Sequence, residues 1–341
     1  CPGALQAYRF AVIEPHLDAW RDQRFLGARC TNGDDHAMTN LVLSLGHDSV
    51  YQSTATVETL VPSTYERLCK MYVRWGRSAT REVVYAELHR RSRALRSRPD
   101  LLVDLSYGPT PREHIDVFTQ QGGAPVFIFV HGGYWRALEK DIFLAVCAPF
   151  ADRGFVAVNV DYGLRPEFTL PEIVAQVLRA ITFIAGNAAS YGGRADRIVL
   201  CGHSAGGHMV AWAASEDWRA RGVEEIEIKA VVPVSGIFDL GPLRQTSIND
   251  DLALDANTAR RLSPFYHLSR PLPPMLCVVG GGETKGFLEQ TQKFDTALQA
   301  AGHMSQALIA EGLDHFSICR ALADPDSAVF ARVMDFMEAQ I

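Results

Sequence analysis

The fold is decided by the stretch Arg197-Ile-Val-Leu-Cys-Gly-His-Ser-Ala-Gly-Gly-His-Met209. Its first half is a short apolar run and its second half has apolar residues at helical spacing, which predicts a strand, a sharp turn and a helix. Gly202-His-Ser-Ala-Gly206 in the turn matches G-x-S-x-G, where small residues two before and two after the serine allow the backbone to turn tightly and expose the hydroxyl. Ser204 is therefore the candidate nucleophile. A serine that only marks close packing between glycines is the alternative.

Strands and helices alternate along the chain on both sides of this turn. This order is typical of a mostly parallel sheet covered by helices on both faces, which is the fold class that we expect. An antiparallel pair, residues 101–105 and 114–118, is expected to open the sheet. The other predicted strands are residues 126–130, 155–160, 198–201, 230–234, 276–279 and 306–310, and the predicted helices are residues 139–153, 170–191, 252–262 and 287–300.

The segment before the sheet differs from the rest of the chain. Residues 1–60 carry no pattern to which we assign chemistry. Helical periodicity begins at Ser63, and a second helical stretch is expected at residues 82–95. We therefore expect an N-terminal extension, residues 1–80, that is partly helical and packs on a main domain formed by residues 81–341.

The composition is that of an ordinary globular protein. The 341 residues are 48% hydrophobic, enough for one large core, and the net charge is −6. This charge balance argues against a nucleic-acid partner, and the basic stretch at residues 90–98 is expected to form a solvated helix face. No run approaches the roughly 18 apolar residues of a membrane helix, so no membrane partner is expected.

The cysteines give no sign of a metal site. The seven of them show no CxxC and no spacing typical of zinc, so we expect reduced packing residues in a cytoplasmic protein. The glycines at 280–282 are not followed by Gly-Lys-Ser/Thr, which argues against a phosphate loop. We expect neither a metal nor a cofactor. Cys1 stands where an initiator methionine is usual, so a cleaved leader or a lipid-bearing cysteine is the alternative for the start of the chain.

A serine nucleophile needs a base to take its proton, and the base needs an acid to orient it. In G-x-S-x-G enzymes the acid and the base follow the serine in that order along the chain. His315 is the candidate base because it lies in a polar turn just after the last predicted strand. His303 precedes that strand and is therefore on the wrong side of it.

The acid should follow an earlier strand. Glu283 ends Val278-Val-Gly-Gly-Gly-Glu283 and is our choice. Asp239 is its rival because it follows the strand at residues 230–234, although Asp239-Leu-Gly-Pro is also typical of a turn or a helix cap. Asp314 is a poor candidate because it directly precedes His315, and side chains adjacent in the sequence usually point apart.

Acyl transfer also needs donors for the oxyanion that develops on the carbonyl oxygen. The amide of Ala205 and those of Gly132 and Gly133 suit this role, because such enzymes use the residue after the nucleophile and an early glycine loop. Tyr134 and Trp135 follow that loop, and we expect them at the mouth of the pocket, where they would suit a flat aromatic substrate. Core packing is the alternative for both rings.

Several motifs together resemble the kynurenine formamidase (arylformamidase) group of α/β-hydrolases, from about residue 80 to the end of the chain. They are His131-Gly-Gly-Tyr-Trp-Arg136, Tyr107-Gly108, Gly202-His-Ser-Ala-Gly-Gly-His208, Arg261-Leu-Ser-Pro264 and Asp314-His-Phe-Ser317.

The resemblance implies an α/β-hydrolase that converts N-formyl-L-kynurenine to L-kynurenine and formate without a metal. It implies Ser204 as nucleophile, His315 as base and Glu283 as acid. The family more often has a second acidic residue where Lys285 or Gly286 stands, and aspartate is a usual acid of its triad, so Asp239 stays open as the alternative acid.

Other functions are compatible with the same motifs. A carboxylesterase of the hormone-sensitive-lipase type, or an aryl amide or carbamate hydrolase, is the runner-up, although such esterases usually have a third glycine where Tyr134 stands. A ligand-binding protein that has kept the fold without catalysis is the remote alternative. The expected partner is a small aromatic amide or ester, and a homodimer is the candidate assembly.

Overall fold

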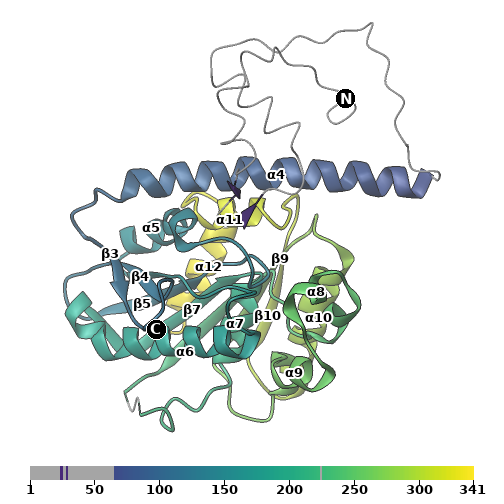
Figure 1. The fold of residues 1–341 in the computed structure, drawn as a ribbon. Helices are drawn as coiled ribbons and strands as arrows, with labels where there is room; N and C mark the ends of the chain where they lie inside the picture. The colour runs from purple at the N-terminus through teal and green to yellow at the C-terminus, as the bar shows by residue number, and fades with distance from the viewer. Residues whose placement is uncertain (1–23, 26–27, 30–64, 223–224) are drawn as a thin grey trace, which may run out of the picture. The chain divides into compact units, whose positions relative to one another are not determined.

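The computed structural model describes residues 24–25, 28–29, 65–222 and 225–341 (Figure 1). The chain divides into two compact units, Cys1–Arg77 and Ser78–Ile341. In the first unit, strands β1 (Arg24–Phe25) and β2 (Ala28–Arg29) pair antiparallel. The sequence assigns no chemistry to residues 1–60, and apart from these four residues that segment lies outside the described residues.

One helix replaces the two that the sequence predicts before the sheet. Helix α4 (Tyr65–Leu95) runs without a break through Gly76. A glycine inside a helix costs only about 1 kcal/mol relative to alanine, so it marks a break only weakly. In the second unit, Tyr85 of this helix packs edge-on against the rings of Phe143 and Phe316, which explains why this helix face is apolar.

In the described part of the chain, eight strands form one sheet in the order β10-β9-β8-β7-β5-β6-β4-β3. The six strands β5, β6, β7, β8, β9 and β10 are parallel to one another. Strands β3 and β4 pair antiparallel with each other, as the sequence predicts, and β4 pairs antiparallel with β6. The bounds are β3 (Leu101–Ser106), β4 (His114–Phe118), β5 (Ala124–Val130), β6 (Val156–Val160), β7 (Gly193–His203), β8 (Ile228–Val234), β9 (Met275–Gly280) and β10 (Ser305–Ala310).

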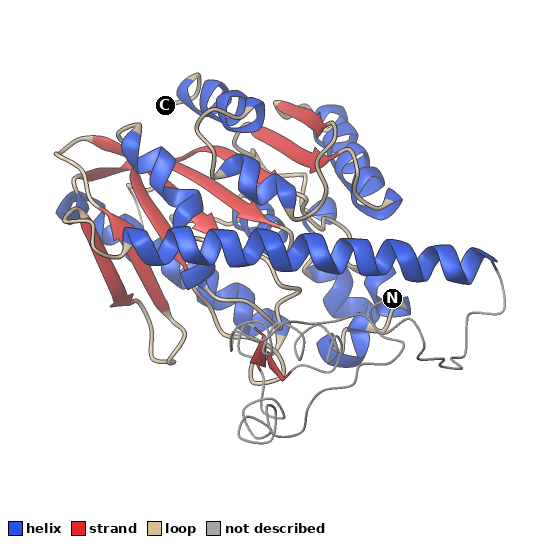
Figure 2. Cartoon of the chain, turned by 90° about the horizontal axis from the view of Figure 1, so that it is seen from above, coloured by secondary structure: helices blue, strands red, loops and turns tan. Residues whose placement is uncertain are grey.

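Helices cover both faces of this sheet, which confirms the predicted fold class (Figures 1 and 2). Helices α6, α7 and α10 share one core cluster with one face. On the other face, Phe150 of α5 stacks on Phe127 of β5 and meets Phe330 of α12. The helices after α4 are α5 (Leu144–Asp152), α6 (Leu170–Asn187), α7 (Ala205–Ala213), α8 (Ile248–Leu252), α9 (Ala256–Arg261), α10 (Lys285–Ala300), α11 (Ser317–Leu322) and α12 (Ala328–Glu338), with 3-10 turns η2 (Lys140–Ile142), η3 (Ala188–Tyr191), η4 (Gly241–Gln245) and η5 (Pro264–Tyr266).

Helix α6 is more apolar than the sequence analysis allowed. Among the described residues, the stretch Leu170–Tyr191 is long and apolar enough by composition to cross a membrane. More than half of that stretch is buried inside the protein, where its apolar side joins the core. A capping box between Thr169 and Glu172 begins the helix. Burial against the sheet therefore explains the composition.

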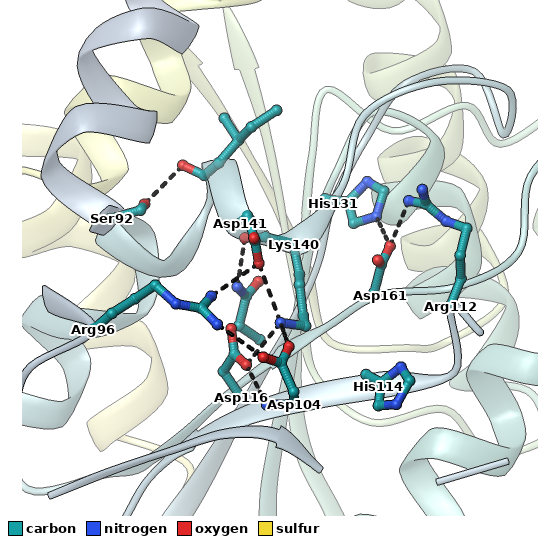
Figure 3. Close-up of polar contacts among 12 residues, drawn as sticks. Ser92, Arg96, Asp104, Arg112, His114, Asp116, His131, Lys140, Asp141 and Asp161 are labelled. Carbon is teal, nitrogen blue, oxygen red and sulfur yellow. Dashed lines mark hydrogen bonds and ion pairs between the residues drawn. The ribbon is translucent and has the colours of Figure 1, made fainter. Parts of the chain in front are cut away.

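The basic stretch at residues 90–98 is not simply a solvated face, contrary to the prediction. Arg96 contacts Asp104 and Asp141, and Arg98 contacts Asp100 and Asp152. Lys140 lies at the centre of the first cluster, 2.6 Å from Asp104 and 2.8 Å from the fully buried Asp116 (Figure 3). The hydrogen bond from Lys140 lowers the pKa of Asp104, whereas burial raises that of Asp116. These charges tie the residues just after α4, together with η2, to the antiparallel edge of the sheet.

The buried His208 makes stability depend on pH. Its Nε2 lies 2.8 Å from the carbonyl oxygen of Leu262, and burial lowers its pKa to about 4. In the unfolded chain a histidine has a pKa of about 6.5, so on acidification the unfolded state takes up the proton first. We expect the free energy of unfolding to fall between about pH 6.5 and pH 4, by about 3 kcal/mol for this group at 1.36 kcal/mol per pKa unit.

The measurement is urea unfolding at intervals of pH, for the wild type and for His208→Gln, which keeps an N–H donor and does not titrate. The difference between the two curves isolates His208 from other histidines. Parallel pH profiles for the two proteins would contradict this prediction.

Candidate active site

Ser204 lies at a sharp turn between β7 and α7. Its backbone has φ 56° and ψ −113°, a conformation that residues with a side chain rarely adopt. The turn is closed so tightly that a Cβ at Gly202 would lie 2.4 Å from the carbonyl oxygen of Gly206, and one at Gly206 would lie 1.9 Å from that of Val130. Both glycines of G-x-S-x-G are therefore required by space.

Two side chains from later strand ends meet Ser204 in one line of contacts. His315, in the turn after β10, has its Nε2 3.1 Å from Ser204 Oγ. Its Nδ1 lies 2.6 Å from Oε2 of Glu283, which follows β9. The structure thus brings together the three residues that the sequence singles out as nucleophile, base and acid.

Glu283 is held in place by donors that the sequence analysis missed. Its second oxygen, Oε1, accepts hydrogen bonds from Ser235 Oγ at 2.5 Å and from the amide of Gly280 at 2.9 Å. The carboxylate is buried, and Ser235 follows the neighbouring strand β8. No local pattern distinguishes Ser235 from any other serine at a strand end.

His315 is also held through its backbone and its ring. Nε2 of His203 lies 2.8 Å from the carbonyl oxygen of His315, and the two rings are 4.6 Å apart. Burial and the nearby His315 hold the pKa of His203 well below its usual value, so this ring is neutral and carries one proton. Because a carbonyl oxygen only accepts, that proton is on Nε2. The ring of Phe287 in α10 also lies near His315, with ring centroids 4.4 Å apart.

The alternative residues make other contacts. Asp239 Oδ1 accepts a hydrogen bond from the amide of Gly241 at 2.9 Å, which is the turn-capping role that Asp239-Leu-Gly-Pro also predicts. Asp314 accepts the amides of Phe316 and Ser317 at the start of α11. His303 Nε2 lies 2.8 Å from the carbonyl oxygen of Leu268. Of these acidic residues and Glu283, Glu283 is the one whose carboxylate contacts the His315 ring.

The glycine loop after β5 comes close to Ser204. A Cβ at Gly132 would lie 3.1 Å from the Ser204 Cβ, and Gly133 has φ +115°, which favours glycine. Within the described ranges, the amides of Gly132, Gly133 and Ala205 donate no hydrogen bond to the protein. These three donors are therefore free of protein partners, and two of them belong to Gly132, which lies close to Ser204, and to Ala205, which follows it.

The expectation for Trp135 is wrong. Its side chain is 0% exposed and packs edge-on against His208 with ring centroids 5.0 Å apart, so it belongs to the core and not to the mouth of a pocket. Tyr134 is partly buried, and burial raises the pKa of its hydroxyl. Both residues have positive φ, 50° for Tyr134 and 56° for Trp135, so the chain turns here. The Trp135 ring is buried, whereas Tyr134 is only partly buried.

Comparison with known proteins identifies the family. The BD-FAE family matches residues 115–298, slightly more than half of the chain. The chain is 32% identical over 237 residues to kynurenine formamidase of Danio rerio, covering 67% of this chain and 79% of that protein. This chain belongs to the kynurenine formamidase-like α/β-hydrolases.

Esterases are among the similar proteins as well. This kynurenine formamidase-like chain is 27% identical to the isoprenylcysteine alpha-carbonyl methylesterase ICME of Arabidopsis thaliana, covering 64% of this chain and 57% of that protein. The crystal structure of esterase B from Lactobacillus rhamnosis shares the fold, with a TM-score of 0.63 at 17% identity over 81% of this chain and 95% of that chain. The kynurenine formamidase-like protein is thus a hydrolase of the formamidase or esterase type.

Metal-ligating side chains do not gather near this site. Throughout the part of the chain that the structure describes, no three His, Cys, Asp or Glu side chains are placed to share a metal ion. The carboxylate and imidazole nearest to Ser204 contact each other instead. The expected absence of a metal and of a cofactor stays a prediction.

Proposed function

We propose that this hydrolase cleaves an aryl formamide, with N-formyl-L-kynurenine as the favoured substrate and L-kynurenine and formate as products. The observation that carries the proposal is the line of contacts from Glu283 through His315 to Ser204, beside three free backbone amides. The similarity to kynurenine formamidases supports the choice of acyl group.

The geometry suits an acyl-enzyme mechanism. Ser204 Oγ attacks the formyl carbon while Nε2 of His315 takes the hydroxyl proton. Glu283 accepts a hydrogen bond from the Nδ1–H of His315, which fixes the tautomer whose Nε2 has a free lone pair. The amides of Gly132, Gly133 and Ala205 stabilise the oxyanion of the tetrahedral intermediate.

In the next step His315 changes from base to acid, and in the last step it acts as a base again. His315 donates its new proton to the nitrogen of the aryl amine, the C–N bond breaks, and the formyl group stays on Ser204 as an ester. Water then attacks this ester and gives its proton to His315. When the C–O bond to Ser204 breaks, the proton returns to the serine oxygen and formic acid leaves, which ionises to formate and a proton in water.

The size of the acyl group tests the proposal. A formyl group needs room for only one hydrogen beyond the carbonyl, so we expect kcat/KM to fall steeply from formyl to acetyl to butyryl on the same aryl leaving group. The measurement is kcat/KM for N-formylkynurenine, for other aryl formamides and for a series of p-nitrophenyl esters.

An esterase should give the opposite trend, because each buried methylene contributes about 0.8 kcal/mol. The similarity to ICME keeps this second function in view. If butyryl or hexanoyl esters are preferred and formyl amides are not cleaved, the formamidase proposal is wrong and the esterase function replaces it.

The aromatic wall of the leaving-group side is proposed to be Phe287. A leaving group that takes its proton from His315 lies beside the imidazole. The ring of Phe287 is partly buried, and its centroid is 4.4 Å from that of the imidazole. We expect Phe287→Ala to raise KM for aryl formamides by about threefold to tenfold, with little change in kcat, since an aromatic contact contributes about 0.5 to 1.5 kcal/mol.

Alkyl formamides are the matched control, because they have no ring to contact Phe287. Their KM should be the same for the wild type and for Phe287→Ala. An equal rise in KM for alkyl and aryl substrates would contradict a ring contact with the leaving group.

We also propose that the protein works in the cytoplasm. Four cysteines, Cys147, Cys201, Cys277 and Cys319, are free and buried, and burial raises the pKa of each thiol. Free thiols are typical of a reducing compartment. Fractionation of cells that express the protein, with an antibody as probe, tests this location.

A further inference from the structure

One tyrosine hydroxyl holds two successive carbonyl groups of the glycine loop. Tyr162, just beyond β6, is 0% exposed. Its hydroxyl lies 2.8 Å from the carbonyl oxygen of His131 and 3.2 Å from that of Gly132, so its single proton is shared between two acceptors. Burial raises the pKa of Tyr162 well above its usual value, which keeps the hydroxyl protonated as a donor.

This contact sets the direction of two amides. In a trans peptide unit the carbonyl oxygen and the N–H of the next residue point in opposite directions. The carbonyls of His131 and Gly132 both turn toward the Tyr162 hydroxyl. The N–H groups of Gly132 and Gly133 therefore point away from Tyr162, to the other side of the loop, where successive N–H groups form a concavity for an anion.

Tyr162 itself is fixed by stacking and by charge. Its ring stacks on the His131 imidazole with centroids 4.3 Å apart, and the Phe143 ring is parallel to that imidazole at 5.8 Å. Nε2 of His131 lies 3.0 Å from Asp161 Oδ1, which also accepts the amide of Tyr162 and an N–H of Arg112 (Figure 3). The hydroxyl therefore has little freedom to leave the loop.

The remaining contact of the loop agrees with this arrangement. Nδ1 of His131 lies 2.7 Å from the carbonyl oxygen of Gly132, on which the Tyr162 hydroxyl also acts. Arg112 donates hydrogen bonds to the carbonyl oxygens of Tyr162 and of Leu138, which lies a few residues after the glycine pair, and so links Tyr162 to the chain that follows the loop. The glycine loop is thus held through its carbonyl oxygens, and its amides stay free.

We infer that Tyr162 is a positioning residue for hydrolysis, because its hydroxyl sets the direction of the two glycine amides that receive the oxyanion. The inference rests on the proposed function of Ser204 and of these amides. It does not depend on which acyl group is cleaved. Tyr162 touches neither the substrate nor the reacting atoms and acts through the backbone of the loop.

A second tyrosine provides a matched control. Tyr107 is also buried, and its hydroxyl donates to a backbone carbonyl oxygen, that of Asp161, at 2.6 Å. Within the described residues, its hydroxyl makes no hydrogen bond to the glycine loop. Tyr107→Phe and Tyr162→Phe therefore each remove one buried hydroxyl, and only the second change removes a hydroxyl that contacts the glycine loop.

The experiment compares both variants with the wild type on the ester or amide that the wild type cleaves fastest. Removing one oxyanion donor costs about a hundredfold to a thousandfold in kcat, so loosening two donors in Tyr162→Phe should lower kcat by about tenfold to a hundredfold. KM should stay within about twofold, and Tyr107→Phe should keep kcat within about twofold. Affinity for an aryl trifluoromethyl ketone, which forms a tetrahedral adduct with the serine, should fall in Tyr162→Phe alone.

Urea unfolding separates this effect from stability, since both variants lose one buried hydrogen bond. 3-Fluorotyrosine at position 162 keeps the hydroxyl and should restore kcat. An equal loss of kcat in the two variants, or an unchanged kcat and ketone affinity in Tyr162→Phe, overturns the inference while the proposed function stands. If the wild type neither reacts with a fluorophosphonate nor cleaves any substrate, the proposed function fails and this inference falls with it.

Discussion

Ser204→Ala should lower kcat by about a millionfold, the loss seen when the serine of a comparable triad is removed. The hydroxyl forms the covalent bond to the acyl group, and among the described residues no other side-chain oxygen is hydrogen-bonded to His315 Nε2. The fold should survive, because within the described part of the chain Ser204 Oγ is hydrogen-bonded to His315 alone, and the backbone hydrogen bonds of Ser204 need no side chain.

Two measurements check this result. Steady-state kinetics on the best substrate give the loss in kcat, and labelling by a fluorophosphonate should disappear in the variant. Urea unfolding at pH 7 should give a similar midpoint for both proteins. Activity within tenfold of the wild type, once contamination is excluded, would remove Ser204 from the mechanism, and an unlabelled wild type would favour the remote alternative of a binding protein.

The fold was predictable because each strand is marked locally. Runs such as residues 126–130 are apolar throughout, as expected for strands buried on both faces, and helical periodicity separates them. Element ends were less accurate. The predicted helix at residues 139–153 is the 3-10 turn η2 followed by α5, and Lys140 is drawn into the ion cluster rather than exposed on a helix.

The candidate site was predictable where chemistry follows a strand end. Ser204, Glu283 and His315 each follow a strand of one parallel sheet, whose carboxyl ends share an edge. Trp135 was misplaced because burial of a ring after a loop depends on tertiary packing, here against His208. Tyr162 could not be found, since a bond from a side chain to a distant backbone carbonyl leaves no pattern in the sequence.

The second large effect concerns the acid. Glu283→Gln should lower kcat by about a thousandfold or more, as removal of the triad carboxylate does elsewhere. The glutamine keeps the shape of the side chain and its Oε1 still accepts from Ser235 and Gly280. Its amide then faces Nδ1 of His315 as a donor, which favours the tautomer with the proton on Nε2, and that nitrogen no longer accepts the Ser204 proton.

Asp239→Asn is the matched control for this change. Its carboxylate accepts only the amide of Gly241 among the described residues, and an asparagine oxygen accepts the same bond, so kcat should stay within about threefold. Kinetics of both variants on one substrate decide between the two acids. A large loss of kcat in Asp239→Asn with a small loss in Glu283→Gln would contradict this prediction and identify Asp239, which follows β8, as the acid. The tautomer of His315 would then not be set by Glu283, although its Oε2 lies 2.6 Å from Nδ1.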